Sequence, residues 1–176
     1  MPGILRTNTI QKINGSAPTL NDLSISHAGS VLQVVTGSTA TQATATETNY
    51  ATPIDTGLAA TITPKFSSSK ILIIIHASIG GSAAGIGVNL SLKRGGSLMA
   101  ANSTVPGDEA GLLAYALARA DGVNETFGCN LLDSPGTTSS TEYRLFFTRY
   151  GGSGTAYFNW SNEKDMSSIT LMEIKQ

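Results

Sequence analysis

The stretch ILIIIHASIGGSAAGIGVNL contains the spacing Gly81-x-x-x-Gly85-x-Gly87, which short-chain dehydrogenases use to cradle a dinucleotide. That chemistry needs a helix after the last glycine, because the N-terminal amides of the helix bind the pyrophosphate. Here the residues after Gly87 alternate apolar and polar until Gly95-Gly96, and a period of two predicts a strand. The Tyr-x-x-x-Lys pair of those enzymes is also absent. We therefore interpret the glycines as a loop between two strands and expect no cofactor.

The other residues that could do nucleophilic or metal chemistry are isolated. The sequence contains no Gly-x-Ser-x-Gly, Walker A or His-Glu-x-x-His motif. Cys129 is the sole cysteine, which excludes an intramolecular disulfide and a cysteine-based zinc site, and we interpret it as a core residue on an inward strand position. His76 shares a strand face with Leu72 and Ile74, which favours a core or interface histidine over a metal ligand. His27 carries no signal.

Three carboxylates and four aromatic residues are the remaining candidates for a binding or hydrolytic site. Asp108 and Glu109 could form half of a cation or glycosidase site, but a solvated loop explains them better. Asp133 precedes Ser134-Pro135, where a carboxylate commonly caps a turn. The four aromatic candidates are Tyr143, Tyr150, Tyr157 and Trp160. A sugar-binding surface would use those that are exposed, whereas aromatic side chains at inward strand positions belong to the core. We expect that the protein is not an enzyme.

Composition limits the classes of partner. The net charge is −1 and 13% of the 176 residues are charged, so no positive excess would hold the chain on nucleic acid or on an anionic membrane. Apolar runs such as Ile71–Ile75 are far shorter than the ~20 residues of a membrane helix. The opening MPGILRTNTIQ lacks the apolar region of a signal peptide. We expect a soluble protein made in a cytoplasm.

From Ser30 onward the chain predicts one all-β domain, residues 29–176, of about nine short strands separated by turn residues. Leu112–Ala120 fits a strand or a helix, and the Thr- and Ala-rich link Gly37–Gly57 has room for another edge strand. The predicted strands are Val31–Gly37, Leu58–Pro64, Lys70–Ile79, Val88–Arg94, Leu112–Ala120, Phe127–Asp133, Glu142–Tyr150, Thr155–Trp160 and Ser168–Lys175.

Residues 1–28 differ from the rest because no strand or helix period is sustained there. Such a segment either frays or lies extended against a larger partner. Its many apolar residues favour an extended N-terminal arm used for attachment: Ile4, Leu5, Ile10, Ile13, Leu20, Leu23 and Ile25.

The order of several segments resembles a small β-domain of structural proteins from tailed phages, especially marine and cyanobacterial ones. The likeness covers most of the chain and is weakest over residues 100–125. The resemblance implies a jelly-roll-like antiparallel sandwich, a homotrimer and a place on the virion. The matching segments are Gly29–Val35, Asp55–Ile79, Leu90–Met99, Asn130–Arg149, Ala156–Trp160 and Ser167–Gln176, with Ile4–Leu20 similar to a leader that precedes this domain in fibre proteins.

Two functions fit this resemblance. The first is a trimeric capsid-decorating (cement) protein whose arm binds the major capsid protein or another virion component, because the chain has one domain and one arm and lacks a shaft, a collagen-like repeat and coiled-coil heptads. The alternative is a short tail fibre or receptor-binding tip that contacts a host-surface glycan. Neither function uses a cofactor, nucleic acid or a membrane.

Overall fold

The computed structural model describes residues 28–48, 52–99, 112–117, 124–160 and 165–176. Within these ranges the chain forms eleven strands and no helix, so the all-β prediction is confirmed. The predicted arm, apart from Ala28, lies outside the described residues. The strands are β1 (Val31–Thr39), β2 (Ala43–Ala45), β3 (Ile54–Ile62), β4 (Lys70–Gly81), β5 (Gly87–Arg94), β6 (Ser97–Leu98), β7 (Leu112–Leu117), β8 (Asn124–Asp133), β9 (Thr141–Tyr150), β10 (Ala156–Phe158) and β11 (Ser167–Ile174).

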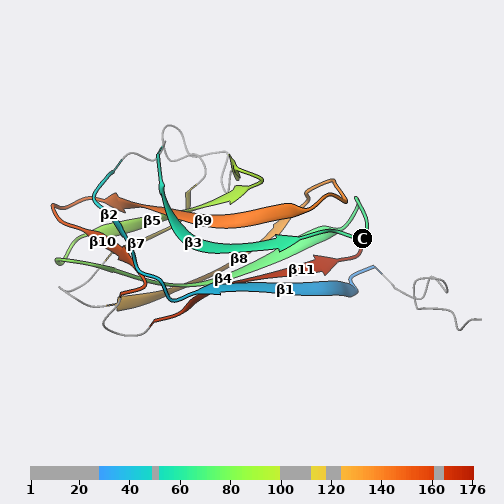
Figure 1. Cartoon of the computed structure of the whole chain (residues 1–176), viewed down its shortest axis with the longest axis horizontal. Helices are drawn as coiled ribbons and strands as arrows, with labels where there is room; N and C mark the ends of the chain where they lie inside the picture. The colour runs from blue at the N-terminus through green and yellow to red at the C-terminus, as the bar shows by residue number, and fades with distance from the viewer. Residues whose placement is uncertain (1–27, 49–51, 100–111, 118–123, 161–164) are drawn as a thin grey trace, which may run out of the picture.

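The strands form two antiparallel sheets that face each other (Figure 1). Sheet A has the order β1-β11-β4, with β8 on the other side of β4, and β10 and β2 continue it beyond the end of β11. Sheet B has the order β3-β9-β5, followed by β7 and the short β6. The eight longest strands are β1, β3, β4, β5, β7, β8, β9 and β11. If these strands are renumbered one to eight in chain order, sheet A has the order 1-8-3-6 and sheet B has the order 2-7-4-5. This is the jelly-roll arrangement, as the resemblance implied.

The core lies between the sheets and follows from the period of two along each strand. In β4 the side chains of Ile71, Ile73 and Ile75 are at most 1% exposed, and they face Leu145 and Phe147 of the opposite sheet's β9, which are fully buried. Aromatic packing adds to this core, since the Phe147 and Phe158 rings lie 6.1 Å apart between centroids. The sandwich is therefore stabilised mainly by apolar burial.

The glycine-rich stretch is a loop between strands, as expected. β4 ends at Gly81, β5 begins at Gly87, and Gly85 adopts a positive φ of 83° in the turn between them. The loop is anchored on both sides, because Ser82 exchanges hydrogen bonds with Thr155 at 2.9 Å and Ile86 is fully buried. No helix follows the glycines, so they have no dipole to offer a phosphate.

Three details go beyond the sequence prediction. A short edge strand, β2, does lie in the link Gly37–Gly57. The two-residue strand β6, which pairs with the end of β5 across Gly95-Gly96, was not predicted. Residues 112–117 are a strand rather than a helix, whereas residues 118–120 of that segment lie outside the described part of the chain.

Candidate functional site

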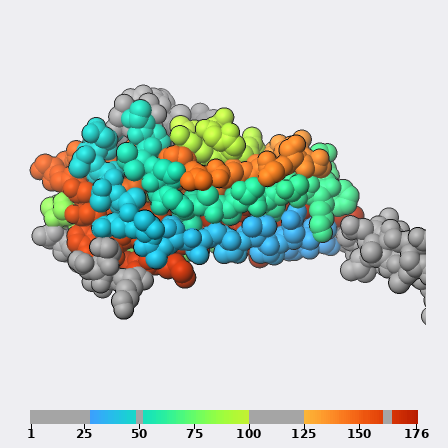
Figure 2. Space-filling view, viewed as in Figure 1, coloured from blue at the N-terminus to red at the C-terminus, as the bar shows by residue number. Residues whose placement is uncertain are grey.

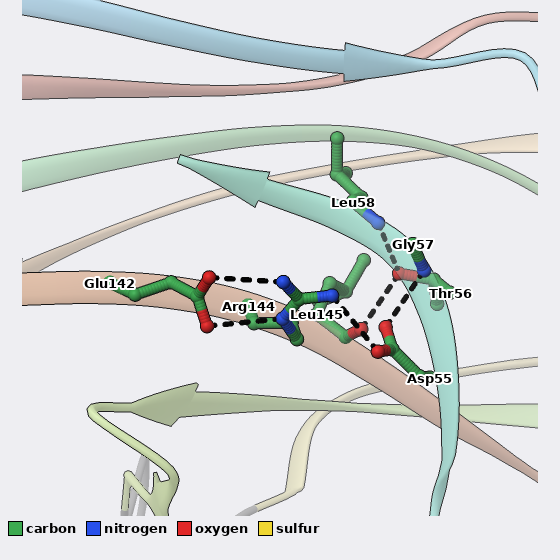
Figure 3. Close-up of polar contacts among 7 residues, drawn as sticks. All are labelled: Asp55, Thr56, Gly57, Leu58, Glu142, Arg144 and Leu145. Atoms are coloured by element: carbon green, nitrogen blue, oxygen red, sulfur yellow. Dashed lines mark hydrogen bonds and ion pairs between the residues drawn. The ribbon is translucent and has the colours of Figure 1, made fainter. Parts of the chain in front are cut away.

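The outer side of sheet B carries a charged cluster at a bulge in β3 (Figure 3). The Arg144 guanidinium on β9 donates to both carboxylate oxygens of Glu142 at 3.0 and 3.1 Å, and to Asp55 of β3 at 2.9 Å. The second Asp55 oxygen accepts the Gly57 amide at 2.8 Å, and the Thr56 hydroxyl donates to the Leu145 carbonyl at 2.7 Å. The cluster thus fixes the bulge and joins two strands.

Electrostatics support a structural role for this cluster. The hydrogen bond from Arg144 lowers the pKa of Glu142, and the same bond raises the pKa of Arg144. Both groups therefore keep their charges at neutral pH, and each is satisfied by the other. Surface pairs of this kind contribute little, about 0–1 kcal/mol, and neither Glu142 nor Arg144 is poised to exchange a proton.

A second cluster joins the two sheets at the end of β8. Asp133 accepts two hydrogen bonds from Arg94 of β5, at 2.8 and 2.9 Å, and one from the Tyr143 hydroxyl of β9 at 2.6 Å. Burial raises the pKa of Tyr143, and the hydrogen bond and charge of Asp133 raise it further. The interpretation of Asp133 as a turn cap is therefore wrong, because its carboxylate points to the other sheet.

A shallow pocket of about 370 Å³ lies beside this cluster. Its described lining comprises Arg94 and Asp133 together with Ser97, Leu98 and Met99. Because the two charged groups are paired with each other, the described lining offers neither a net charge nor an unpaired acid or base. Its chemistry does not favour a particular ligand.

Glu173 is a fully buried carboxylate at the end of β11. It accepts hydrogen bonds from the Gln33 side chain at 2.6 Å and from the backbone amides of Lys65 and Phe66 at 2.7 and 3.2 Å. Burial alone would raise the pKa of Glu173, but these hydrogen bonds outweigh it and the net pKa is lowered. The carboxylate ties β1 and β11 to the turn between β3 and β4.

Asn159 forms a buried polar node just after β10. Its backbone has a positive φ of 51°, a conformation that asparagine tolerates better than most residues. Its side-chain amide donates to the carbonyl oxygens of Thr39 and Thr41, and its side-chain oxygen accepts the Ser167 hydroxyl at 2.7 Å. The Ser167 hydroxyl oxygen in turn accepts the Ser78 amide at 2.9 Å. Strands β1, β4 and β11 meet at this residue.

The isolated residues singled out in the sequence show no reactive arrangement where the structure describes them. Cys129 faces inward opposite Ile75 and packs against the core, and burial raises the pKa of its thiol. His76 does share the face of Leu72 and Ile74, but it is exposed rather than buried.

Several candidates lie outside the described residues: His27, Asp108, Glu109 and the arm residues Ile4, Leu5, Ile10, Ile13, Leu20, Leu23 and Ile25. Among the residues that are described, no three His, Cys, Asp or Glu side chains group as metal ligands. The same part of the chain contains no helix that could cross a membrane.

The four aromatic candidates divide between core and surface. Tyr143 is fully buried and belongs to the core. Tyr157 and Trp160 are half-buried and pack edge to face, with ring centroids 4.1 Å apart. Tyr150, at the end of β9, is 42% exposed. The aromatic candidates that remain accessible to a sugar are thus Tyr150 and the Tyr157–Trp160 pair.

The outer side of sheet A carries the largest group of exposed apolar side chains among the described residues. Val34, Leu132 and Ile74 are 52%, 54% and 41% exposed. Cross-strand register aligns Val34, Met172, Leu72 and Leu132 in one row across all four long strands of the sheet. We call this surface the apolar face and define it by Val31, Val34, Leu72, Ile74, Leu132, Met172 and Ile174.

Polar side chains share this side of the sheet with the apolar ones, because Thr36, Thr170 and Asn130 lie in the row of Ile74. Lys70 lies at one end, in the row of Ile174. Ser168 and His76 form the row at the other end, and the next position, Ser78, donates a hydrogen bond to Asp165 at 2.6 Å. Exposed apolar side chains bordered by polar ones occur at many protein–protein interfaces. Among the described residues, the apolar face is therefore the best candidate for a functional site.

The sequence contains a pattern that indicates this surface, but the surface was not predicted from it. The run Ile71–Ile75 is apolar on both strand faces, which correctly predicts a central strand. One face of that run enters the core, and the other is left on the surface with Leu72 and Ile74. The remaining members of the apolar face come from β1, β8 and β11, and only the register of the folded sheet brings them together.

No family model and no curated protein matches the sequence. Among solved structures, the chain is similar to the VP2 subviral particle of infectious bursal disease virus, with a TM-score of 0.47, 12% identity, and coverage of 83% of this chain and 34% of that one. The virus's Gx strain gives a TM-score of 0.44 at 13% identity, covering 81% and 32%. Eiger TNF from S. frugiperda gives a TM-score of 0.43 at 11% identity, covering 84% and 95%.

The chain thus spans about a third of the length of the viral proteins it matches. With TM-scores below 0.5 and identities of 11–13%, these similarities assign no function to the chain.

Proposed function

We propose that the chain is a non-enzymatic structural protein of a virus particle, and specifically a capsid-decorating protein of a tailed phage. The observation that carries this proposal is the apolar face, a group of exposed aliphatic side chains on the outer side of sheet A. The largest exposed apolar patch of a protein is often the place where it contacts another protein.

The sequence adds two supports. The order of its segments resembles a domain of tailed-phage structural proteins. Residues 1–28 contain seven leucine and isoleucine side chains, which suit an arm lying along the major capsid protein. The arm would attach the protein to the head, and the jelly-roll domain would stabilise the particle surface.

Electron microscopy of particles labelled with an antibody against this chain tests the proposal. We expect label over the head and not over the tail. Particles that lack the protein should release DNA more readily than complete particles when heated or placed in low salt. Label on the tail alone, with unchanged head stability and lost adsorption to the host, would contradict the decoration role.

One observation favours the alternative of a receptor-binding tail protein. The Tyr157–Trp160 pair leaves part of two aromatic rings accessible on the outer side of sheet A, and such rings can stack on a sugar. Binding of the purified full chain to a glycan array, lost in Trp160→Ala but kept in Leu98→Ala, would support this second function.

A further inference from the structure

We propose that the sandwich docks end-on, through a basic end, onto an acidic surface of the same particle protein that binds the arm. The basic end is defined by Lys65, Phe66, Lys70 and Lys175. This inference rests on the proposed function, since it names the chemistry of the partner surface and the orientation of the bound domain. Two observations carry it: the opposite charges of the two ends of the sandwich, and the place where the described chain begins.

The three lysines of the basic end lie together where sheet A ends. Lys70, the first residue of β4, pairs with Ile174, and Lys175 pairs with the start of the described chain through hydrogen bonds of 2.7 and 3.0 Å. The Lys65 amide donates to Glu173 at 2.7 Å, which places Lys65 at the same end. All three lysines are at least partly exposed, so their charges can reach a partner.

The carboxylates near this end are buried or paired. Glu173 is fully buried, and the side chain of Asp133 is 11% exposed and paired with Arg94. Glu142 is more exposed, but it lies on the outer side of sheet B and is paired with Arg144. Among the described residues, the lysines therefore determine the sign of the surface at this end.

The opposite end of the sandwich has the other sign in the part of the chain that is described. Glu47 is exposed, and its backbone accepts the Arg149 amide near the end of β9. Glu125 lies near the start of β8, and Asp165 lies just before β11. Arg149 is the basic group there, and its guanidinium is engaged by backbone carbonyl oxygens. The charge of the domain is thus polarised along its strands.

Exposed apolar side chains lie among the lysines of the basic end. Phe66 is 36% exposed, and the Lys175 ammonium lies 5.4 Å from the centre of its ring. Val31 of the apolar face, in the row of Lys70, is 52% exposed. Aromatic residues often form the centre of an interface, and charged residues its rim. The basic end can therefore make apolar contacts as well as ion pairs.

The described chain begins at the basic end (Figure 1). A protein that binds residues 1–27 therefore holds this end near its own surface, and such a tether raises the effective concentration for a second contact. Within that segment, two basic residues accompany one acidic residue: Arg6, Lys12 and Asp22. The arm and the basic end thus both favour a partner surface of negative sign.

A second copy and a nucleic acid fit these charges less well. Two basic ends that meet would repel each other. If the basic end of one copy met the acidic end of the next, the 27 preceding residues would have to lie between the copies. A nucleic acid is usually bound by a stripe of lysine and arginine along one face, whereas these three lysines occupy one narrow end of the sandwich.

Co-sedimentation with particles that lack the protein tests the role of the charges. Binding of the full chain should weaken about ten-fold between about 0.1 M and about 1 M salt, because the screening length falls from ~10 Å to ~3 Å. Lys65→Gln with Lys70→Gln should weaken binding about ten-fold at the lower salt concentration and remove most of the salt dependence. Lys65→Arg with Lys70→Arg keeps both charges and should bind as the wild type does.

Two glutamates near the opposite end provide the matched control. Thr44 and Thr46 are exposed, and the row of Thr44 includes Gly80, ten residues along β4 from Lys70. Thr44→Glu with Thr46→Glu changes the net charge by as much as the two glutamine substitutions do, but far from the basic end, so binding should stay within about two-fold. Circular dichroism checks that all variants are folded. Equal weakening by the control would overturn the inference, because net charge alone would then explain the effect.

Carbodiimide cross-linking tests the contact itself. The reagent joins a lysine amine to a carboxylate that touches it through an amide bond, and the oxygen lost from the carboxylate leaves in the urea that the reagent becomes. Mass spectra should show peptides of Lys65 or Lys70 linked to an aspartate or glutamate of a particle protein. Links from Lys93 alone would overturn the end-on orientation, since Lys93 lies over the Phe146 ring on the outer side of sheet B.

Binding to particles that neither salt nor the glutamine substitutions weaken overturns the inference. Multimers of the purified chain that the glutamine variant loses would also overturn it, because the acidic surface would then belong to another copy. A gel shift of linear DNA at about 0.15 M salt, lost in the same variant, would identify a nucleic acid instead.

The proposed function fails separately from this inference. A chain that labels the phage head, but binds equally well with Lys65→Gln and Lys70→Gln, remains a decorating protein without an acidic docking site. A chain that labels only the tail, and does so through Lys65 and Lys70, keeps the acidic partner and loses the decoration role.

Discussion

Glu173 shows how a single side chain can close the end of a sheet. A carboxylate without hydrogen bonds would not remain charged at a fully buried position, because its desolvation is costly. Here the Gln33 side chain and two backbone amides replace the lost water. Asn159 plays a comparable part near the opposite end of the strands, where its hydrogen bonds reach Thr39, Thr41 and Ser167.

The lowered pKa of Glu173 predicts a pH dependence of stability. A carboxyl whose folded pKa lies below its unfolded value stabilises the fold above the unfolded pKa, and loses this effect as pH falls through the folded pKa. We expect the free energy of unfolding in urea to decrease below about pH 5. In Glu173→Gln this part of the decrease should vanish, and stability at pH 7 should drop by about 1–3 kcal/mol.

Glu142→Gln is the matched control for that measurement. The pKa of Glu142 is also lowered, by its hydrogen bond with Arg144, but its side chain is 42% exposed. Its loss should change stability by less than about 1 kcal/mol. If both variants retain the wild-type pH dependence, the buried hydrogen bonds of Glu173 do not stabilise its charge.

At the scale of elements, the approach of β1 to β3 closes one edge of the sandwich, where the two strands are in direct contact in Figure 2. Gly37 makes this approach possible, because a Cβ there would lie 1.9 Å from the Ala59 carbonyl oxygen. We expect Gly37→Ala to destabilise the fold by about 1–3 kcal/mol, since backbone cannot move aside as a flexible side chain can. Urea denaturation of the full chain measures the change.

Gly128→Ala in β8 serves as the matched variant, because the nearest atom to its added Cβ is the Ile75 carbonyl oxygen at 3.9 Å, an ordinary contact. It should leave stability unchanged or raise it by about 0.5 kcal/mol, since alanine costs less backbone entropy than glycine in a strand. Equal effects of the two substitutions would mean that β1 and β3 separate at little cost.

The period of two was sufficient to predict most of the elements, because strands such as Val88–Arg94 place apolar residues inward at every second position. One residue of this strand differs from the expected alternation of buried and exposed positions. Asn89 points away from the core, as predicted, but it is only 3% exposed. The pairing of Asp133 with Arg94 and Tyr143 was not predictable, because it joins residues of three strands in two sheets. The apolar face depends on register in the same way.

At the scale of the whole molecule, the chain separates two kinds of apolar surface. The apolar face is built into a rigid sheet, where cross-strand hydrogen bonds fix the spacing of its side chains. The sequence pattern of residues 1–28 predicts no strand or helix that would fix the spacing of their apolar side chains. Identical copies can match a rigid face, whereas an extended segment can follow the contour of a different protein. We therefore propose that attachment to a different protein is the role of the arm.

Removal of residues 1–27 tests the proposed role of the arm. The shortened chain, which keeps the sandwich and its apolar face, should retain the oligomeric mass and cooperative unfolding of the full chain. When it is added to particles that lack the protein, its binding should fall at least ten-fold in a co-sedimentation assay, because the apolar contacts of the arm are lost. Full-length Ile10→Asp with Ile13→Asp should show the same loss while keeping the length of the arm. If the shortened chain binds particles as well as the full chain does, the sandwich itself carries the attachment site, and the assignment of the arm is wrong.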